Sequence, residues 1–290
     1  MSAFSYAAFN VLRALPRKEV GRVAGSLADL RWQPQLGRAV VEIYRKAYDV
    51  SLDECEQQGG FENFDAFFTR RLRDGVRPVD RAEEAIVSPC DGLVHAVGHV
   101  DPQSRFLVKG NEYTAVDLLG NESDARSVAG GAYTIIYLSP RDYHRVHSPV
   151  DGTVELVRSL PGDFYPVNDL GTKYLPKLFA VNRRVSMKVS SPFGAVYVVM
   201  VAAMIVGRIT VSGIDLQDVP LGDHRLGATT KRGDELGIFH LGSTVVLFFE
   251  EAGFANWELE SGATVRYGER IAKGRLLDTK ASFNGDRGNR

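Results

Sequence analysis

The sequence predicts an α+β fold, in which N-terminal amphipathic helices precede a mainly β, sandwich-like domain with a duplicated core. Apolar residues recur at helical spacing within the first fifty positions. From about residue 85 the spacing shortens and turn residues recur every ten or so positions, which is typical of β-strands. A seven-residue string also returns sixty residues after its first copy. We therefore divide the chain into a helical region at 1–84 and a β-rich domain at 85–290.

Three segments near the N-terminus carry the helical pattern. Apolar residues follow a helical period in 4–15, again in 20–27 and again in 36–47. Pro16 ends the first segment and Pro34 precedes the third, as expected of a residue that interrupts helices. These segments are therefore predicted to form three short amphipathic helices.

The helical region is basic. Residues 1–48 hold eight Lys or Arg and three acids, a net charge of +5 in a chain whose total is −1. Basic amphipathic helices are typical of attachment to an anionic membrane surface. The alternative is that these helices simply pack against the rest of the protein, as most amphipathic helices do. On the first interpretation we expect a peripheral, membrane-associating protein on the cytoplasmic face of the cell membrane.

The bulk composition argues against several classes of protein. The longest apolar run, 195–206, has twelve residues, whereas a membrane-spanning helix needs roughly 20, so a buried strand is expected there. The N-terminus lacks the apolar stretch of a signal peptide, which predicts that the protein is not exported. The net charge argues against a nucleic-acid partner. Cys55 and Cys90 have no metal-type spacing, so neither a zinc site nor a disulfide scaffold is expected.

The repeated string indicates how the β domain is built. Residues 88–94 (SPCDGLV) return as 148–154 (SPVDGTV), and a looser third copy begins at Ser191. In each copy a proline fixes the approach to a turn that leads into a valine-bearing strand. Residues 262–272 also resemble the hairpin of biotinyl and lipoyl carrier domains. These patterns predict a duplicated, pseudo-symmetric sandwich.

Two histidines follow the predicted strand at 133–138. His144 and His147 lie three residues apart in a polar segment, where they could be metal ligands, general bases or surface residues. A metal site usually needs a third protein ligand, and the sequence offers no HExxH motif or cysteine pair. A base needs an orienting carboxylate, which Asp91 or Asp142 could supply.

The Gly242–Ser243 step opens a strongly apolar strand at 245–249. By itself it is an ordinary turn into a strand, and the G-x-S-x-G elbow of a serine hydrolase is absent. A serine hydroxyl can instead attack the carbonyl just before it, and glycine leaves that carbonyl open. β-Elimination from the resulting ester would leave a pyruvoyl group on a new N-terminus, and such a ketone can act as an electron sink.

Several separate segments support that use of Ser243: 64–72, 77–80, 88–92, 137–147, 178–182 and 241–245. Through them the chain resembles bacterial phosphatidylserine decarboxylases of the membrane-associated type, which carry a Leu-Gly-Ser-Thr motif. The resemblance extends from the N-terminal helices to about residue 275.

The resemblance implies a proenzyme that cuts itself between Gly242 and Ser243. The family pattern places a processing triad on Asp91, His147 and Ser243, with His147 as the base and Asp91 orienting its ring. His144 matches a family histidine associated with substrate recognition and decarboxylation. The resemblance also implies that Ser243 becomes a covalent pyruvoyl cofactor, with neither a metal ion nor pyridoxal phosphate.

Cleavage would give a β subunit, 1–242, and an α subunit, 243–290, that stay together. In the implied reaction the amine of phosphatidylserine forms a Schiff base with the pyruvoyl ketone, CO2 leaves, and phosphatidylethanolamine is released. The expected partners are therefore phosphatidylserine, an anionic membrane and the chain's own two subunits, and a homo-oligomer stays open. Arg70, Arg71 and Arg145 are candidates to meet the phosphate by charge alone.

Two other interpretations remain. One is a pyruvoyl decarboxylase acting on another lipid with a serine headgroup. The other is a non-catalytic, membrane-docked β domain of the biotinyl type, which is disfavoured because no Met-Lys-Met carrier signature surrounds Lys231 or Lys273.

Overall fold

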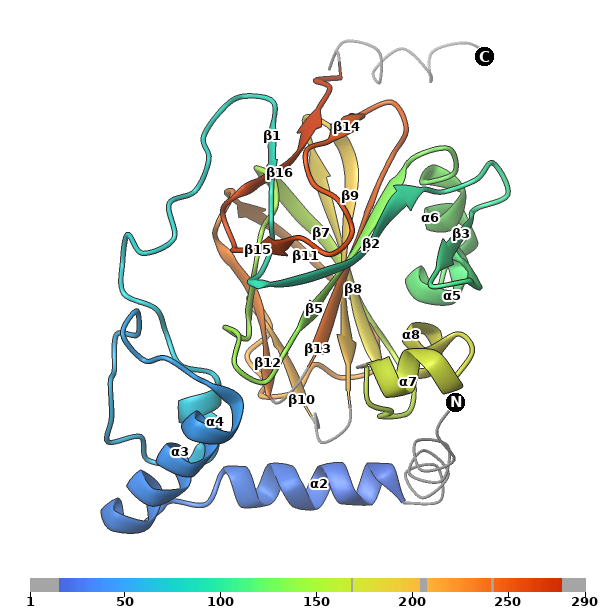
Figure 1. Cartoon of the computed structure of the whole chain (residues 1–290). Coiled ribbons are helices and arrows are strands. Elements are labelled where there is room, and N and C mark those ends of the chain that lie inside the picture. The colour runs from blue at the N-terminus through green and yellow to red at the C-terminus, as the bar shows by residue number, and fades with distance from the viewer. Residues whose placement is uncertain (1–15, 168, 204–207, 241–242, 278–290) are drawn as a thin grey trace, which may run out of the picture.

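The computed structural model describes residues 16–167, 169–203, 208–240 and 243–277. An antiparallel β body forms most of the molecule, and three helices of the N-terminal region lie at one end of it (Figure 1). The α+β class and the order of helices before strands are confirmed.

Within the described residues, the helices of the N-terminal region are α2 (Arg17–Ala28), α3 (Pro34–Tyr48) and α4 (Phe64–Phe68). The first two confirm the second and third helices expected from periodicity, and the helix expected at 4–15 lies outside the described residues. Short helices of the body are α5 (Ala115–Leu119), α6 (Glu122–Ser127), α7 (Asp169–Tyr174) and α8 (Leu178–Val181).

The strands of the first half are β1 (Ala85–Val87), β2 (Gly92–His99), β3 (Arg105–Val108), β4 (Asn111–Thr114), β5 (Ala132–Leu138), β6 (Arg145–His147), β7 (Gly152–Leu160) and β8 (Arg184–Ser191). Those of the second half are β9 (Gly194–Ala202), β10 (Arg208–Val211), β11 (Gly222–Thr230), β12 (Glu235–His240), β13 (Ser243–Phe249), β14 (Phe254–Trp257), β15 (Thr264–Val265) and β16 (Arg270–Gly274).

The large sheet has eight strands in the order β11–β7–β8–β9–β13–β5–β2–β15. Its middle strand, β13, pairs along its whole length with β5 on one side and with β9 on the other. Every residue of β13 is buried, as are residues 195–202 of β9. Burial on both faces requires apolar side chains at successive positions, which explains the unbroken apolar runs in the sequence.

Two smaller sheets confirm the duplicated core. β1 pairs with β16, which pairs with β14, and in the same way β6 pairs with β12, which pairs with β10. β1 leads through the first copy of the repeated string into β2, and β6 leads through the second copy into β7. In both turns the serine hydroxyl donates to the carbonyl two residues further on, Ser88 to Cys90 and Ser148 to Val150, each at 2.7 Å.

Two other repeats take a different form. The third copy, around Ser191, is the hairpin between β8 and β9. In the segment expected to resemble a carrier hairpin, β15 pairs with β2, whereas β16 pairs with β1 and β14. That segment therefore joins two sheets of the body and does not form a carrier hairpin.

The helical region has a hydrophobic cluster of its own, made of Val41, Val50, Leu52, Cys55, Phe61 and Phe67. Ion pairs attach it to the body: Arg17 to Asp163 at 2.7 Å and Arg208 to Asp29 at 2.5 Å. None of the helices in the described ranges is both long enough and apolar enough to cross a membrane.

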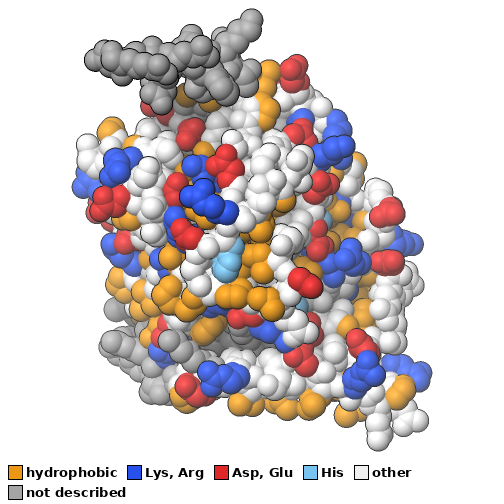
Figure 2. Space-filling model, turned by 180° about the vertical axis from the view of Figure 1, so that it is seen from behind, with side chains coloured by type: hydrophobic (Ala, Val, Ile, Leu, Met, Phe, Trp, Pro, Cys, Tyr) orange, Lys and Arg blue, Asp and Glu red, His pale blue; other side chains and the backbone are white. Residues whose placement is uncertain are grey.

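Part of the apolar stripe on each of α2 and α3 points away from the body. Val23 and Leu27 on α2 are each 58% exposed, and on α3 Leu36 is 58% and Ile43 is 69% exposed. Figure 2 shows apolar side chains gathered along the lower edge of the molecule, where α2 runs in Figure 1. Packing against the body therefore does not account for these stripes.

Candidate active site

Ser243 begins the central strand and is surrounded by buried backbone. It pairs with Leu138 at the end of β5 and with Ala202 at the end of β9. The side chain is fully buried, and its hydroxyl has no hydrogen-bond partner among the described residues. An unsatisfied buried hydroxyl costs about 1–3 kcal/mol, so its presence calls for a functional reason. Gly242 lies outside the described residues.

His147, the last residue of β6, is held in one tautomer. Its Nδ1 lies 2.8 Å from the carbonyl oxygen of Gly233 and therefore carries the proton. Its Nε2 keeps the lone pair and lies 3.3 Å from the Tyr143 hydroxyl, while the ring stacks on Tyr267 with centroids 3.9 Å apart. Burial lowers the pKa of His147 despite the Gly233 carbonyl and nearby carboxylates, which act to raise it. The ring is therefore neutral at pH 7 and able to accept a proton.

Asp91 is bound by an arginine and a backbone amide. The guanidinium of Arg77 donates to Oδ2 from Nη2 at 2.7 Å and from Nε at 3.1 Å. The backbone N–H of Tyr267 donates to Oδ1 at 2.9 Å. Tyr267 thus connects the two predicted residues, because its backbone binds Asp91 and its ring covers His147. Within the described part of the chain, no hydrogen bond joins Asp91 directly to His147.

His144 is fully buried beside Phe68, with ring centroids 4.0 Å apart. Its Nδ1 donates to the carbonyl oxygen of Asp142 at 2.8 Å, and its Nε2 has no partner among the residues described. Burial, and secondarily the charge of Arg70, lower the pKa of His144 to about 3. The carboxylate of Asp142, the other candidate to orient a histidine, accepts from the backbone N–H of Ser139 at 2.7 Å.

The predicted residues gather at one end of the large sheet. Asp91 immediately precedes β2 and Ser243 begins β13, with β5 between those strands, so about two strand spacings, roughly 10 Å, separate their backbones. The backbone N–H of His147 donates to the carbonyl of Pro89 at 2.7 Å, on the turn that carries Asp91. The structure thus brings Asp91 and His147 together and places Ser243 near them, without a described hydrogen bond from Ser243 to either.

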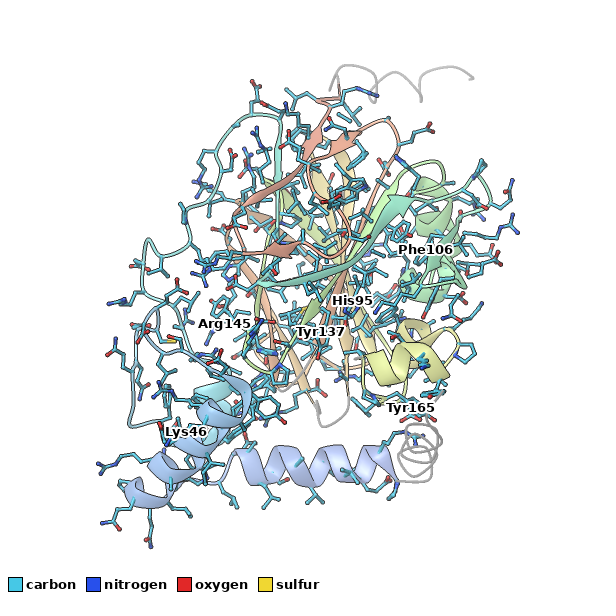
Figure 3. All side chains as sticks on the ribbon, viewed as in Figure 1. Lys46, His95, Phe106, Tyr137, Arg145 and Tyr165 are labelled. Atoms are coloured by element: carbon cyan, nitrogen blue, oxygen red, sulfur yellow. The ribbon has the colours of Figure 1, made fainter. Side chains whose placement is uncertain are left out.

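Aromatic and basic side chains surround this end of the sheet. His95 and Tyr137 stack with centroids 5.0 Å apart beside the strand pair β2–β5 (Figure 3). Arg145 extends toward α4, where its Nε donates to the carbonyl of Thr69 at 2.8 Å, and its Nη1 pairs with Glu235 at 2.7 Å. The helical region therefore borders the candidate site. The described residues contain no group of three or more His, Cys, Asp or Glu arranged to hold a metal ion.

Sequence reasoning missed Tyr267 and Gly233, which position Asp91 and His147. A signal for them exists in a second, shorter repeat, because 231–234 (KRGD) and 266–269 (RYGE) share the order basic, variable, glycine, acid. Both glycines have positive φ, 86° at Gly233 and 87° at Gly268, and both turns meet a copy of the longer repeat.

Comparison with known proteins identifies the family of the chain. The family model for phosphatidylserine decarboxylase matches residues 64–273. A phosphatidylserine decarboxylase proenzyme of Psychrobacter arcticus is 37% identical over 272 residues, covering 90% of this chain and 96% of that protein. The proenzyme of Myxococcus xanthus is 39% identical over 269 residues, with the same shares covered. That of Haemophilus ducreyi is 34% identical and covers 89% of this chain and 91% of its own. The chain belongs to the phosphatidylserine decarboxylase family.

Proposed function

We propose that this protein is a phosphatidylserine decarboxylase, made as a precursor that cuts itself between Gly242 and Ser243. The observation that carries the proposal is the buried, unpartnered hydroxyl of Ser243 at the head of the central strand. The relatives whose names include the word proenzyme support a precursor stage.

The chain's own residues supply what self-cleavage requires. The hydroxyl of Ser243 would attack the carbonyl carbon of Gly242 and exchange the amide for an ester, whose β-elimination frees the two pieces as a Gly242 carboxylate and a dehydroalanine at residue 243. Water would then hydrolyse the dehydroalanine, which loses its nitrogen as ammonia and gives the pyruvoyl ketone. His147 has its lone pair on Nε2 and is neutral, so it would take the hydroxyl proton there. The negative charge of Asp91, one contact away through Tyr267, would stabilise the imidazolium that forms.

The surroundings of Ser243 fit a pyruvoyl group. The hydroxyl would leave no broken hydrogen bond among the described residues, and the ladders to β5 and β9 would fix the new terminus. When formed, the group supplies a ketone that condenses with an amine and withdraws electrons from the adjoining carbon. His144 offers a neutral, buried Nε2 to the substrate, and a water-poor site favours loss of CO2 because that step disperses charge.

The same ladders would keep the two pieces together after the cut. β13 would belong to the 243–290 fragment, whereas β5 and β9 belong to the 1–242 fragment. Seven residue pairs on each side and complete burial of β13 would hold the smaller fragment in place.

The exposed stripes of α2 and α3 support docking on a membrane. Apolar side chains that face solvent on a basic helical region suit the boundary of an anionic bilayer. We place the protein on the cytoplasmic face of the cell membrane, where the diacyl tails of the substrate would stay in the bilayer. The site at the adjoining end of the sheet would then receive the headgroup.

Expression of Ser243→Ala tests the processing scheme. Wild-type protein is expected to run as two fragments on a denaturing gel, with the smaller one blocked at its N-terminus and reactive toward hydroxylamine. The variant is expected to stay a single chain of 31.9 kDa. Two fragments from Ser243→Ala would contradict the scheme. Release of labelled CO2 from phosphatidylserine, compared with release from free serine and other serine lipids, tests the substrate.

Membrane docking is tested by Leu27→Glu combined with Ile43→Glu. Burying such side chains is worth about 1.5–3 kcal/mol each, so binding to anionic vesicles is expected to fall more than tenfold in a sedimentation assay. Leu107→Glu is the matched control, because Leu107 is 62% exposed on β3, outside the helical region. Equal losses in the control and in the double variant would contradict docking through α2 and α3.

A further inference from the structure

Arg70, two residues beyond α4, is a buried cation with unused hydrogen-bond donors. The residue is 6% exposed. Its Nη2 donates to the carbonyl oxygens of Arg141 at 2.8 Å and Asp142 at 3.3 Å. Its Nε and Nη1 are buried and have no hydrogen-bond partner in the described part of the chain. Burying a guanidinium without a carboxylate partner is unfavourable, so this arrangement calls for a reason.

The other buried arginines of the described chain show how unusual this is. Four of them pair with carboxylates: Arg77, Arg145, Arg183 and Arg232. The fifth, Arg184, directs its N–H groups at four carbonyl oxygens. Within this set only Arg70 keeps donors free.

Three ionisable groups near Arg70 do not balance its charge. Its charge acts on Tyr44, Cys55 and His144, and the Cys55 thiol also lies close enough to interact with its guanidinium. Burial raises the pKa of Tyr44 and of Cys55, and it lowers the pKa of His144 to about 3. All three groups are therefore neutral at pH 7, and a positive charge remains beside His144.

Arg70 lines a cavity of about 440 Å³ with basic walls. Arg71 and Arg145 line it too, against one carboxylate, that of Glu56. Arg71 is exposed and Arg145 is already paired with Glu235, so the buried free donors come from Arg70. A second cavity that Arg70 lines, of about 270 Å³, contains four acidic residues and suits an anion less.

We propose that Arg70 binds the phosphodiester of the substrate headgroup in this basic cavity, an assignment that rests on the proposed function. Phosphate matches the planar fork of a guanidinium. Between the two anionic groups of the substrate, the chemistry favours the phosphate. An arginine paired with the carboxylate would stabilise the ground state and oppose loss of CO2, whereas the phosphodiester keeps its charge throughout the reaction. Arg70 thus anchors the headgroup next to His144.

Steady-state kinetics of Arg70→Gln tests the assignment. The KM for phosphatidylserine is expected to rise at least tenfold, with kcat within threefold of the wild type. Glycerophosphoethanolamine has the phosphodiester and amine but no carboxylate, and its inhibition constant is expected to rise at least tenfold as well. Arg126→Gln, which removes a charge from an exposed arginine on α6 that does not line the cavity, is expected to change both values less than twofold.

Two results would overturn the proposal. One is a rise in KM without any change in the inhibition constant of glycerophosphoethanolamine, which would assign Arg70 to the carboxylate. The other is a fall in kcat at constant KM. Arg70→Lys keeps the charge and is expected to recover part of the KM effect, which separates a binding role from a fold defect.

A direct binding measurement tests the anion site at Arg70 if Arg70→Gln fails to self-process or if the wild type releases no CO2. Calorimetry with glycerophosphoethanolamine compares the intact Ser243→Ala chain with the same chain carrying Arg70→Gln. At least tenfold weaker binding in the double variant supports the anion site even where the proposed function fails. Equal binding by the two chains overturns it.

Discussion

The turn at 88–91 and the turn at 148–151 are two copies of one backbone structure with different side chains. The N–H of Val87 donates to the carbonyl of Pro149 at 3.0 Å, and the N–H of His147 donates to the carbonyl of Pro89 at 2.7 Å. The two turns are therefore bonded to each other reciprocally. Each also receives a turn of the shorter repeat, through N–H donors at Gly268 in one case and Gly233 in the other, at 3.0 and 2.9 Å.

The two copies differ in the side chains that this shared backbone structure holds. Asp91 accepts from the backbone N–H of residue 267 and Asp151 from that of residue 232, each at 2.9 Å. Yet the Asp91 side chain is 11% exposed, against 47% for Asp151. His147 occupies the place that Val87 has in the other copy. The reciprocal hydrogen bonds bring Asp91, from one copy, close to His147, from the other. A nearly symmetric backbone therefore holds a candidate site whose two halves have different side chains.

The largest expected effect comes from exchanging the residues that differ most. His147→Ala removes the neutral base and is expected to slow self-cleavage by about a thousandfold, within the usual range for a positioned base. The measurement is the time course of the precursor band on a denaturing gel. Val87→Ala, at the equivalent place, is expected to lower the free energy of unfolding by about 1–3 kcal/mol and to leave the cleavage rate unchanged. If His147→Ala and Val87→Ala slowed cleavage equally, His147 would matter for folding and not as a base.

A smaller effect is expected at the two aspartates. Asp91→Asn removes the charge that stabilises an imidazolium at His147 and is expected to slow cleavage about a hundredfold. Asp151→Asn changes the equivalent, half-exposed carboxylate and is expected to stay within threefold of the wild type. Circular dichroism of both variants checks the fold. If Asp151→Asn slowed cleavage as much as Asp91→Asn, the proposal that Asp91 rather than Asp151 stabilises the imidazolium would be wrong.

The smallest expected effect is on the pH dependence of the free energy of unfolding. His144 and Glu84 are equivalent, since each precedes the edge strand of a small sheet and its carbonyl accepts from the neighbouring strand, from Phe239 of β12 at 3.0 Å and from Gly274 of β16 at 2.8 Å. The pKa of His144 is about 3 when folded and near 6.5 when unfolded, so the unfolded chain binds the extra proton between those values. Stability is therefore lost as pH falls, by about 2 kcal/mol between pH 7 and pH 5.

Urea unfolding of the Ser243→Ala chain at the two pH values measures that loss. His144→Gln is expected to reduce it by about 2 kcal/mol, because the titrating group is gone. Glu84→Gln is the matched control at the equivalent place and is expected to leave the histidine contribution intact. An unchanged pH dependence in His144→Gln would contradict a buried, neutral His144.

Local patterns in the sequence predicted much of the fold. The helices at 17–28 and 34–48, the strand at 132–138 and the buried strands β9 and β13 all follow from periodicity, which depends on neighbours along the chain. The repeated string predicted the duplicated core. Periodicity shows that a helix has an apolar stripe but not what covers it, so the exposure of Leu27 and Ile43 was not predictable.

The candidate site was predictable as a set of residues and not as a set of contacts. Asp91, His147 and Ser243 were identified by resemblance, and the structure places them at one end of the sheet. The binding of Asp91 by Arg77 and the cover of His147 by Tyr267 join segments far apart in the chain. Such pairings depend on the register of several strands at once, which one sequence does not reveal. The free donors of Arg70 likewise depend on which carboxylates the fold leaves out of reach.

The central position of β13 determines the order in which the chain folds and is cut. Chain termini usually lie at the surface, but a cut before Ser243 would create one in the interior, between β5 and β9. A separate peptide would have to insert between two formed strands to rebuild that arrangement. Folding therefore has to precede cutting. Once unfolded, the mature protein would be two separate chains whose reassembly depends on concentration. Unfolding of the cleaved protein is therefore expected to be irreversible, unlike unfolding of the precursor.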